Sequence, residues 1–206
     1  MDRRLHPMPK SSITWLLGSL LTTGLLMTAC VDEATAPAPT PSVTEAPTQE
    51  DGVMAFSIRS NGFGADQPIP SRFTCDGEDL SPALSWSDVP DGTQSFAIIL
   101  DDPDAPRGVF THWVLYNLPP GAQGLPEGVA KTERPDNGGF QGKNGFGNVG
   151  YGGPCPPPGS PHHYRFTLYT LDGLIDLGPG ATKQQVQDAI QGHVLGEAQL
   201  VGTYQR

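Results

Sequence analysis

The sequence predicts a mainly β protein, an antiparallel β-sandwich with small helices close to its C-terminus. Short apolar or alternating segments of strand length recur between residues 53 and 171. The chain has 26 glycines and 22 prolines, which are frequent between these segments and favour turns there. Many short strands with few helical patterns are typical of a sandwich or a barrel.

The expected strands differ in their apolar pattern. Residues 53–59 alternate as a half-buried strand does, and residues 84–86 form a short apolar segment. Residues 95–100 and 112–118 are nearly continuous apolar runs, which indicate consecutive strands in the core. Residues 164–171 alternate large apolar side chains with smaller or polar ones, as a further strand would.

The C-terminal part of the chain carries the helical pattern. Thr182 and Gln185 have the spacing of a capping box, in which each side chain bonds the other residue's backbone N–H. Apolar residues then recur at helical spacing over residues 186–194. Gly192 and Gly196 interrupt this pattern, so we expect two short helices.

Residues 1–29 have the form of a secretory signal peptide. Basic residues precede an apolar stretch over residues 13–27, which is too short and too rich in Thr and Ser to indicate a membrane span. The segment Met27-Thr28-Ala29-Cys30 is similar to a bacterial lipobox, so we expect Cys30 to be the lipidated first residue of the mature chain. The alternative is ordinary cleavage that leaves Cys30 as a thiol.

The mature chain divides into a tether and one domain. Residues 30–51 hold the lipidated cysteine and a Pro/Thr-rich segment that is too polar to fold, and residues 52–206 are long enough for one domain. Loss of residues 1–29, with three basic side chains and one acidic one, changes the net charge from −10 to −12. Such acidity argues against nucleic-acid binding and against electrostatic adhesion to anionic lipid.

The segment Asp101-Asp102-Pro103-Asp104-Ala105-Pro106 indicates a binding site. Each proline holds the residue before it extended, so Asp102 is fixed at the end of a strand. His112 follows ten residues later on the next strand. A rigid carboxylate beside an imidazole suits a preformed polar pocket, whereas the alternative is a solvated Asp-Pro turn.

Two adjacent histidines begin the strand that follows a Gly/Pro-rich segment. Side chains alternate across a strand, so His162 shares a face with Tyr164, and His163 shares the other with Arg165. Two imidazoles and a phenol can donate hydrogen bonds to a phosphate or a carboxylate. The glycines of residues 150–159 let backbone N–H groups approach the same anion.

Three blocks, residues 73–86, 101–117 and 150–172, together resemble the bacterial and archaeal branch of the phosphatidylethanolamine-binding, or Raf kinase inhibitor-like, family. The resemblance implies that family's fold, a central β-sandwich with small helices. It also implies an anion pocket, a rim and supporting residues. The implied pocket residues are Asp102, His112, His162 and Tyr164, with Gly153 and Pro154 on the rim and Asp104 and Pro106 in support.

The charge of Asp102 has a specific effect in such a pocket. A nearby carboxylate favours the protonated imidazole, which is the better hydrogen-bond donor to an anion. The same carboxylate could instead receive a ligand ammonium group. We therefore expect an anionic ligand such as phosphate, or a zwitterionic one such as phosphoethanolamine.

Cys75 and Cys155 lie in two of the three blocks. With Cys30 assigned to the lipid, they form an even pair in an oxidising compartment. The same two positions occur in the family's pattern irrespective of compartment, so a disulfide is expected but not required.

These features predict a non-enzymatic, extracytoplasmic binding protein, anchored to a bacterial membrane through lipid and without cofactor or metal. The protein partner is unknown. One alternative is a protease inhibitor or envelope signalling modulator that acts through surface loops. Another is a small hydrolase with His112 or His162 as base, although the chain has no Gly-x-Ser-x-Gly element. A metal site built from Asp102, His112 and His162 would lack the close ligand spacing of zinc motifs.

Overall fold

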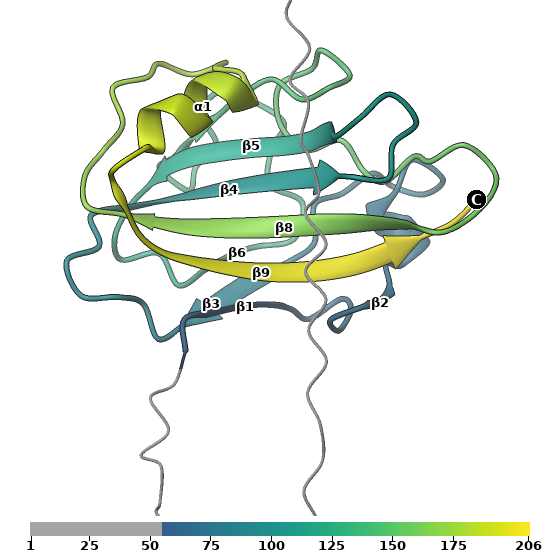
Figure 1. Cartoon of the computed structure of the whole chain (residues 1–206), viewed down its shortest axis with the longest axis horizontal. Helices are drawn as coiled ribbons and strands as arrows, with labels where there is room; N and C mark the ends of the chain where they lie inside the picture. Colours follow the sequence, from purple (N-terminus) through teal and green to yellow (C-terminus); the bar gives the residue numbers. More distant parts are fainter. Residues whose placement is uncertain (1–54) are drawn as a thin grey trace, which may run out of the picture. The chain divides into compact units, whose positions relative to one another are not determined.

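The computed structural model describes residues 55–206, so the signal peptide, the lipidated Cys30 and the tether predicted for residues 1–51 lie outside the described residues. The described strands form two sheets (Figure 1). The smaller sheet has the order β1-β3-β6, with β1 (Ser57–Ser60), β3 (Leu84–Ser87) and β6 (Gly124–Leu125). The larger sheet has the order β2-β9-β8-β4-β5-β7, with β2 (Gln67–Pro68), β9 (Val194–Tyr204), β8 (His162–Leu171), β4 (Ser95–Asp102), β5 (Phe110–Leu118) and β7 (Phe140–Gln141).

The strands pair mainly in antiparallel fashion. Only β2, which lies beside β9, pairs in parallel among the described strands. Neither described sheet closes into a barrel. The mainly β sandwich predicted from the sequence is therefore confirmed.

Apolar side chains cover both faces of the larger sheet. One cluster joins it to the smaller sheet and includes Phe96 and Ile98 of β4 together with Trp86 of β3. The second cluster lies on the opposite face, where Ala97 of β4 packs with side chains of α1 (Lys183–Ile190). Because β4 and β5 are covered on both faces, their sequences are almost continuously apolar rather than alternating.

The helix α1 begins as the capping box predicts. The Thr182 hydroxyl accepts a hydrogen bond from the Gln185 backbone N–H at 3.3 Å, and the Thr182 N–H donates to the Gln185 side chain at 2.9 Å. Val186 and Ile190 are buried against the sheet. The other described helix is a single 3₁₀ turn, Ser71–Phe73. No helix within residues 55–206 is long and apolar enough to cross a membrane.

The prediction of a second C-terminal helix is wrong. The chain turns at Gly192, which has a positive φ of 81°, and continues as the eleven-residue strand β9. This strand pairs with β8 from Leu171 to His162, so tertiary hydrogen bonding outweighs the local helical spacing. Ala198, Leu200 and Gly202 alternate on its buried face, a period-2 signal that sequence inspection missed.

Candidate functional site

Three predicted site residues converge at one end of the larger sheet. Asp102 ends β4, His112 lies near the start of β5 and His162 begins β8. All three line one cavity of about 150 Å³. The remaining walls are mostly apolar and come from Ala105, Pro106, Phe110, Phe146, Cys155, Pro156 and Pro157.

A β-bulge in β5 sets the position of His112. Strands β4 and β5 pair Leu100 with Trp113 and Asp101 with Thr111, which leaves His112 as an extra residue. Strict alternation would place His112 on the face opposite Trp113, but a bulge re-aims the side chain of the extra residue. The His112 ring accordingly packs edge-on against Tyr164, with ring centroids 5.2 Å apart.

Asp102 and His162 form a buried pair. His162 Nδ1 lies 2.7 Å from Asp102 Oδ2, and the two residues are 7 % and 3 % exposed, His162 first. Asp102 Oδ1 accepts the backbone N–H of Asp104 at 2.9 Å. Because a carboxylate only accepts, Nδ1 of His162 carries a proton and Nε2 is the ring nitrogen available to a ligand.

His112 is held in the same tautomer by a different acceptor. Its Nδ1 donates to the Gly152 carbonyl at 2.7 Å, and the residue is 2 % exposed. Burial lowers the pKa of His112, although the Gly152 carbonyl and the Asp102 charge act in the opposite direction. Near neutral pH, His112 is therefore uncharged and also has Nε2 available as an acceptor.

Tyr164 shares a face with His162, as predicted, but it does not line the cavity wall. Its side chain is fully buried, and among the described residues its hydroxyl has no hydrogen-bond partner. Burial and then the Asp102 charge raise the pKa of Tyr164, so the phenol stays protonated. A buried hydroxyl without a hydrogen-bond partner costs free energy. A hydrogen bond from this hydroxyl to an acceptor would remove that cost.

Gly152 and Gly153 do not supply the backbone donors that the sequence suggested. The Gly153 N–H donates to Asp79 Oδ1 at 2.6 Å, and the Gly152 N–H donates to the His112 carbonyl at 2.9 Å. Pro154 has no N–H and its carbonyl accepts from Cys75 at 3.1 Å. Gly153 and Pro154 therefore shape the rim, and neither lines the small cavity.

The two residues predicted to support the pocket have different positions. Pro106 lines the cavity directly. Asp104 accepts two hydrogen bonds from the exposed His163, from the backbone N–H and from Nδ1, each at 2.8 Å. These bonds, the backbone one first, lower the pKa of Asp104. Asp104 thus fixes the loop after β4 to the start of β8.

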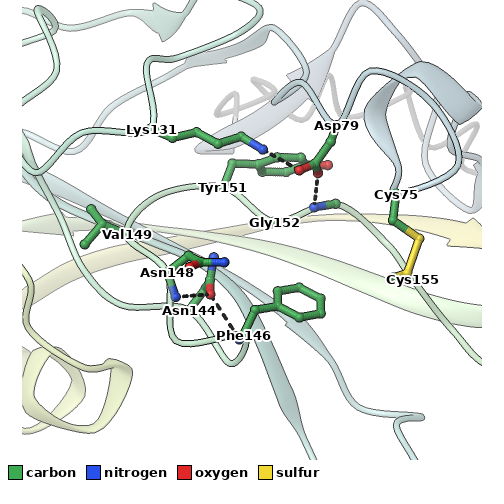
Figure 2. Close-up of a pocket in the computed structure, with 11 residues that line it drawn as sticks. Cys75, Asp79, Lys131, Asn144, Phe146, Asn148, Val149, Tyr151, Gly152 and Cys155 are labelled. Atoms are coloured by element: carbon green, nitrogen blue, oxygen red, sulfur yellow. Dashed lines mark hydrogen bonds and ion pairs between the residues drawn. A yellow bond between two sulfur atoms is a disulfide. The ribbon is translucent and has the colours of Figure 1, made fainter.

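Several bonds hold the rim segment 150–155 to the segment after β2. Cys75 and Cys155 form a disulfide, as the sequence suggested. The Tyr151 hydroxyl donates to the Phe73 carbonyl at 2.6 Å. Asp79 binds Gly153 through one oxygen and Lys131 through the other (Figure 2). No sequence pattern indicated the Tyr151 and Asp79 contacts.

A second and larger cavity, about 540 Å³, lies beside the first. Phe146 and Cys155 line both cavities. The wall of the larger cavity also includes Asp79, Lys131, Asn144, Asn148, Val149 and Tyr151 (Figure 2).

The sequence did not predict Phe110 and Phe146 as site residues. The glycines that pack against their rings are a sequence signal that could have indicated them. A Cβ at Gly145 would lie 2.6 Å from the Phe110 ring, and one at Gly152 would lie 2.8 Å from the Phe146 ring.

Within residues 55–206, no three His, Cys, Asp or Glu side chains are grouped in a way that could hold a metal ion. In the small cavity, the Nδ1 atoms of both imidazoles are already bound to protein acceptors.

The fold and this cavity define a class of protein, a β-sandwich with a buried Asp–His pair at one end of its larger sheet. Residues 59–205 match the family model of the phosphatidylethanolamine-binding proteins. The chain belongs to this family, which confirms the resemblance found in the sequence.

Relatives of known sequence and structure agree with this assignment. A UPF0098 protein of Methanothermobacter thermautotrophicus is 52% identical over 151 residues, which cover 73% of this chain and 99% of the relative. A Mycobacterium tuberculosis protein with the provisional name lipoprotein LppC is 39% identical over 168 residues, 81% of each chain. The crystal structure of a phosphatidylethanolamine-binding protein homologue of Chlamydia trachomatis has a TM-score of 0.68 at 38% identity, covering 74% of this chain and 98% of that one.

His112 should make the free energy of unfolding of the domain depend on pH. The unfolded chain takes up a proton at the ordinary histidine pKa of about 6.5, whereas the folded chain resists protonation until a lower pH. The contribution of neutral His112 to the free energy of unfolding therefore has its full value above about pH 6.5. This contribution is lost as the pH falls toward the lowered pKa. In His112→Asn, whose amide can still donate to Gly152, this loss should be absent. Urea unfolding of both proteins at several pH values, without anions that bind, measures it; a pH-independent difference between them would contradict the assignment.

The disulfide should stabilise the domain and its rim. Cys75→Ser combined with Cys155→Ser should lower the free energy of unfolding by about 2–4 kcal/mol, because the bond closes a loop of 80 residues. Reductant should destabilise the parent domain by a similar amount and leave the double variant unchanged. Urea titrations measure both effects. Two reactive thiols in the denatured, unreduced domain would show that the bond is not formed.

Proposed function

We propose that the small cavity binds one anionic group, a phosphate or a carboxylate, and that the protein is a binding protein rather than an enzyme. The observation that carries this proposal is the shared geometry of its two buried imidazoles. In each, Nδ1 is bound to a protein acceptor and Nε2 is left for a ligand. Tyr164 lies behind the cavity wall, where its ring packs edge-on against His112 and its hydroxyl lies beside Asp102.

The size and lining of the cavity favour a small head group. About 150 Å³ holds roughly five water molecules at about 30 Å³ each, well below the volume of about 300–1,000 Å³ typical of drug-sized ligands. The mostly apolar walls lower the local dielectric constant and so strengthen electrostatic interactions with an anion inside. This proposal fits a phosphate group, and an acyl chain would have to remain outside the cavity.

Anion binding in this cavity requires protons. Each neutral imidazole presents Nε2 as an acceptor, which repels the lone pairs of a fully ionised anion. Protonation converts Nε2 into a donor, and Asp102 partly balances the charge that His162 then gains. We therefore expect the anion and a proton to bind together.

The imidazole and carboxylate of the buried pair also have the arrangement of a general base oriented by an acid group, which keeps a hydrolase as the second candidate. The lining of the small cavity has no Ser, Thr or free Cys nucleophile, so such a hydrolase would have to activate water. Ester or phosphate-ester turnover that His162→Ala abolishes would favour this candidate over a binding protein. A role as a protease inhibitor would instead depend on exposed loops and would be unaffected by that variant.

We place the domain outside the cytoplasm, attached to a membrane through Cys30. The leader and lipobox-like segment support this location, as does a disulfide in the folded domain. A relative that covers 81% of this chain is named a lipoprotein, provisionally.

Sulfate tests the proton-linked anion site, because it carries no ionisable proton near neutral pH. Its affinity should fall as the pH rises, by up to about tenfold per pH unit for each proton taken up. Titration calorimetry in buffers of different ionisation enthalpy measures the number of protons. His162→Ala should weaken binding by about 1.5–3 kcal/mol, the usual value for a hydrogen bond to a charged group. His193→Ala, an exposed histidine that bonds Asp172 beyond the opposite end of β8, is the matched control and should bind as the parent does.

A pH-independent affinity that survives His162→Ala would remove this site from consideration. Asp102→Asn separates the two ligand classes. If the carboxylate also receives an ammonium group, this variant should lose more affinity for phosphoethanolamine than for phosphate at the same pH.

Membrane attachment is tested by detergent phase partitioning of the expressed full chain. The parent protein should enter the detergent phase, because acyl chains at Cys30 supply its membrane affinity. Cys30→Ala should remain in the aqueous phase. Recovery of both proteins from the aqueous phase would contradict a lipid anchor.

A further inference from the structure

Phe146 forms a fixed wall between the two cavities. Asn144 Oδ1 accepts the backbone N–H groups of Phe146 and Asn148 at 3.0 and 3.1 Å, which closes a tight turn (Figure 2). The Phe146 ring packs against Phe110 and His112, with centroid distances of 4.7 and 5.5 Å, yet the residue is 48% exposed. A large apolar side chain held in the open between two cavities can contact a ligand that reaches from one to the other.

The larger cavity contains the ion pair of Asp79 and Lys131, in which the two partners differ in how fully they are hydrogen-bonded. Asp79 has both oxygens engaged, one by the Gly153 N–H and the other by Lys131. Lys131 is the only cationic side chain in the wall of this cavity, and its ammonium group has three N–H donors. Asp79 is the partner found for it among the described residues. Lys131 therefore has unused N–H donors on a flexible side chain, and these donors suit a hydrogen-bond acceptor on a ligand.

We propose that the two cavities form one site for a short ligand with two anionic groups. The small cavity takes the first group, and in this respect the inference rests on the proposed function. Lys131 takes the second group, and Phe146 contacts the apolar spacer between them. An anion here can share the ammonium group with Asp79, which keeps its bond to Gly153. A ligand ammonium group would instead have to displace Lys131 and would then lie beside it.

Phosphonoacids with one, two or three methylene groups test the inference. Phosphonoacetate, 3-phosphonopropionate and 4-phosphonobutyrate are each compared with the alkylphosphonate of the same length, which lacks the carboxylate. At the best length, the phosphonoacid should bind about tenfold more tightly, the factor expected for a weak hydrogen bond to a charged group. Calorimetry at one pH and at low salt measures all six affinities.

Variants of Lys131 identify the group responsible. Lys131→Met should abolish the advantage of the phosphonoacid and leave the affinity for inorganic phosphate unchanged. Lys131→Arg should keep the advantage. Lys143→Met, an exposed lysine just before the Asn144 turn, is the matched control and should behave as the parent does. The Lys131–Asp79 pair is about 40% exposed on both sides, so its loss should leave the fold intact, as thermal unfolding checks.

The two proposals fail in distinguishable ways. If phosphate binds but no phosphonoacid exceeds its alkylphosphonate at any length, the two-cavity site is wrong and the anion pocket stands. The two-cavity site is also wrong if the advantage of the phosphonoacid persists in Lys131→Met. If phosphate and the alkylphosphonates all fail to bind the parent protein, the proposed function itself is wrong.

Discussion

His112 is the unpaired residue of a β-bulge in β5. The bulge turns its side chain into the site, and the rest of the cavity depends on that placement. Without the bulge between the pairs Leu100–Trp113 and Asp101–Thr111, alternation would turn this imidazole toward α1 and away from Tyr164. The Gly152 carbonyl then fixes the ring by accepting from Nδ1. Because the same segment is bonded to Asp79 and to Cys75, the position of the imidazole is tied to the segment between β2 and β3.

The site differs from a simple cluster of positive charge. Its buried cationic candidates are two histidines: burial lowers the pKa of His112, and the ring of His162 lies against the Asp102 carboxylate. If the cavity binds an anion, as we propose, an arginine there would bind it at every pH, whereas a neutral imidazole would bind it only together with a proton. The mostly apolar walls would strengthen this dependence by lowering the local dielectric constant. The pH dependence that we expect of the proposed site therefore follows from the absence of Lys and Arg in the lining of this cavity.

The sequence predicted those parts of the molecule that have local causes. Strand period, proline restriction and the Thr182 capping box depend on neighbouring residues, and the core strand β4 and the capped helix α1 were found where expected. The alternation that separates His162 from His163 was also predicted correctly. What could not be predicted depends on pairing between distant segments: the strand β9, the use of the Gly153 N–H by Asp79, and the placement of Phe146 against His112. Local helical spacing even favoured the wrong structure after Gly192.

The position of the site relative to the start of the domain bears on what can reach it. Phe56, near the first described residue, lies beside Gly196, which pairs with Thr170 on β8. Eight residues of β8 separate Thr170 from His162, about 26 Å at about 3.3 Å per residue. The described chain therefore begins beside one end of β8, whereas His162 and the small cavity lie at the other end. Any ligand of the small cavity would therefore bind at the end of β8 opposite to Phe56.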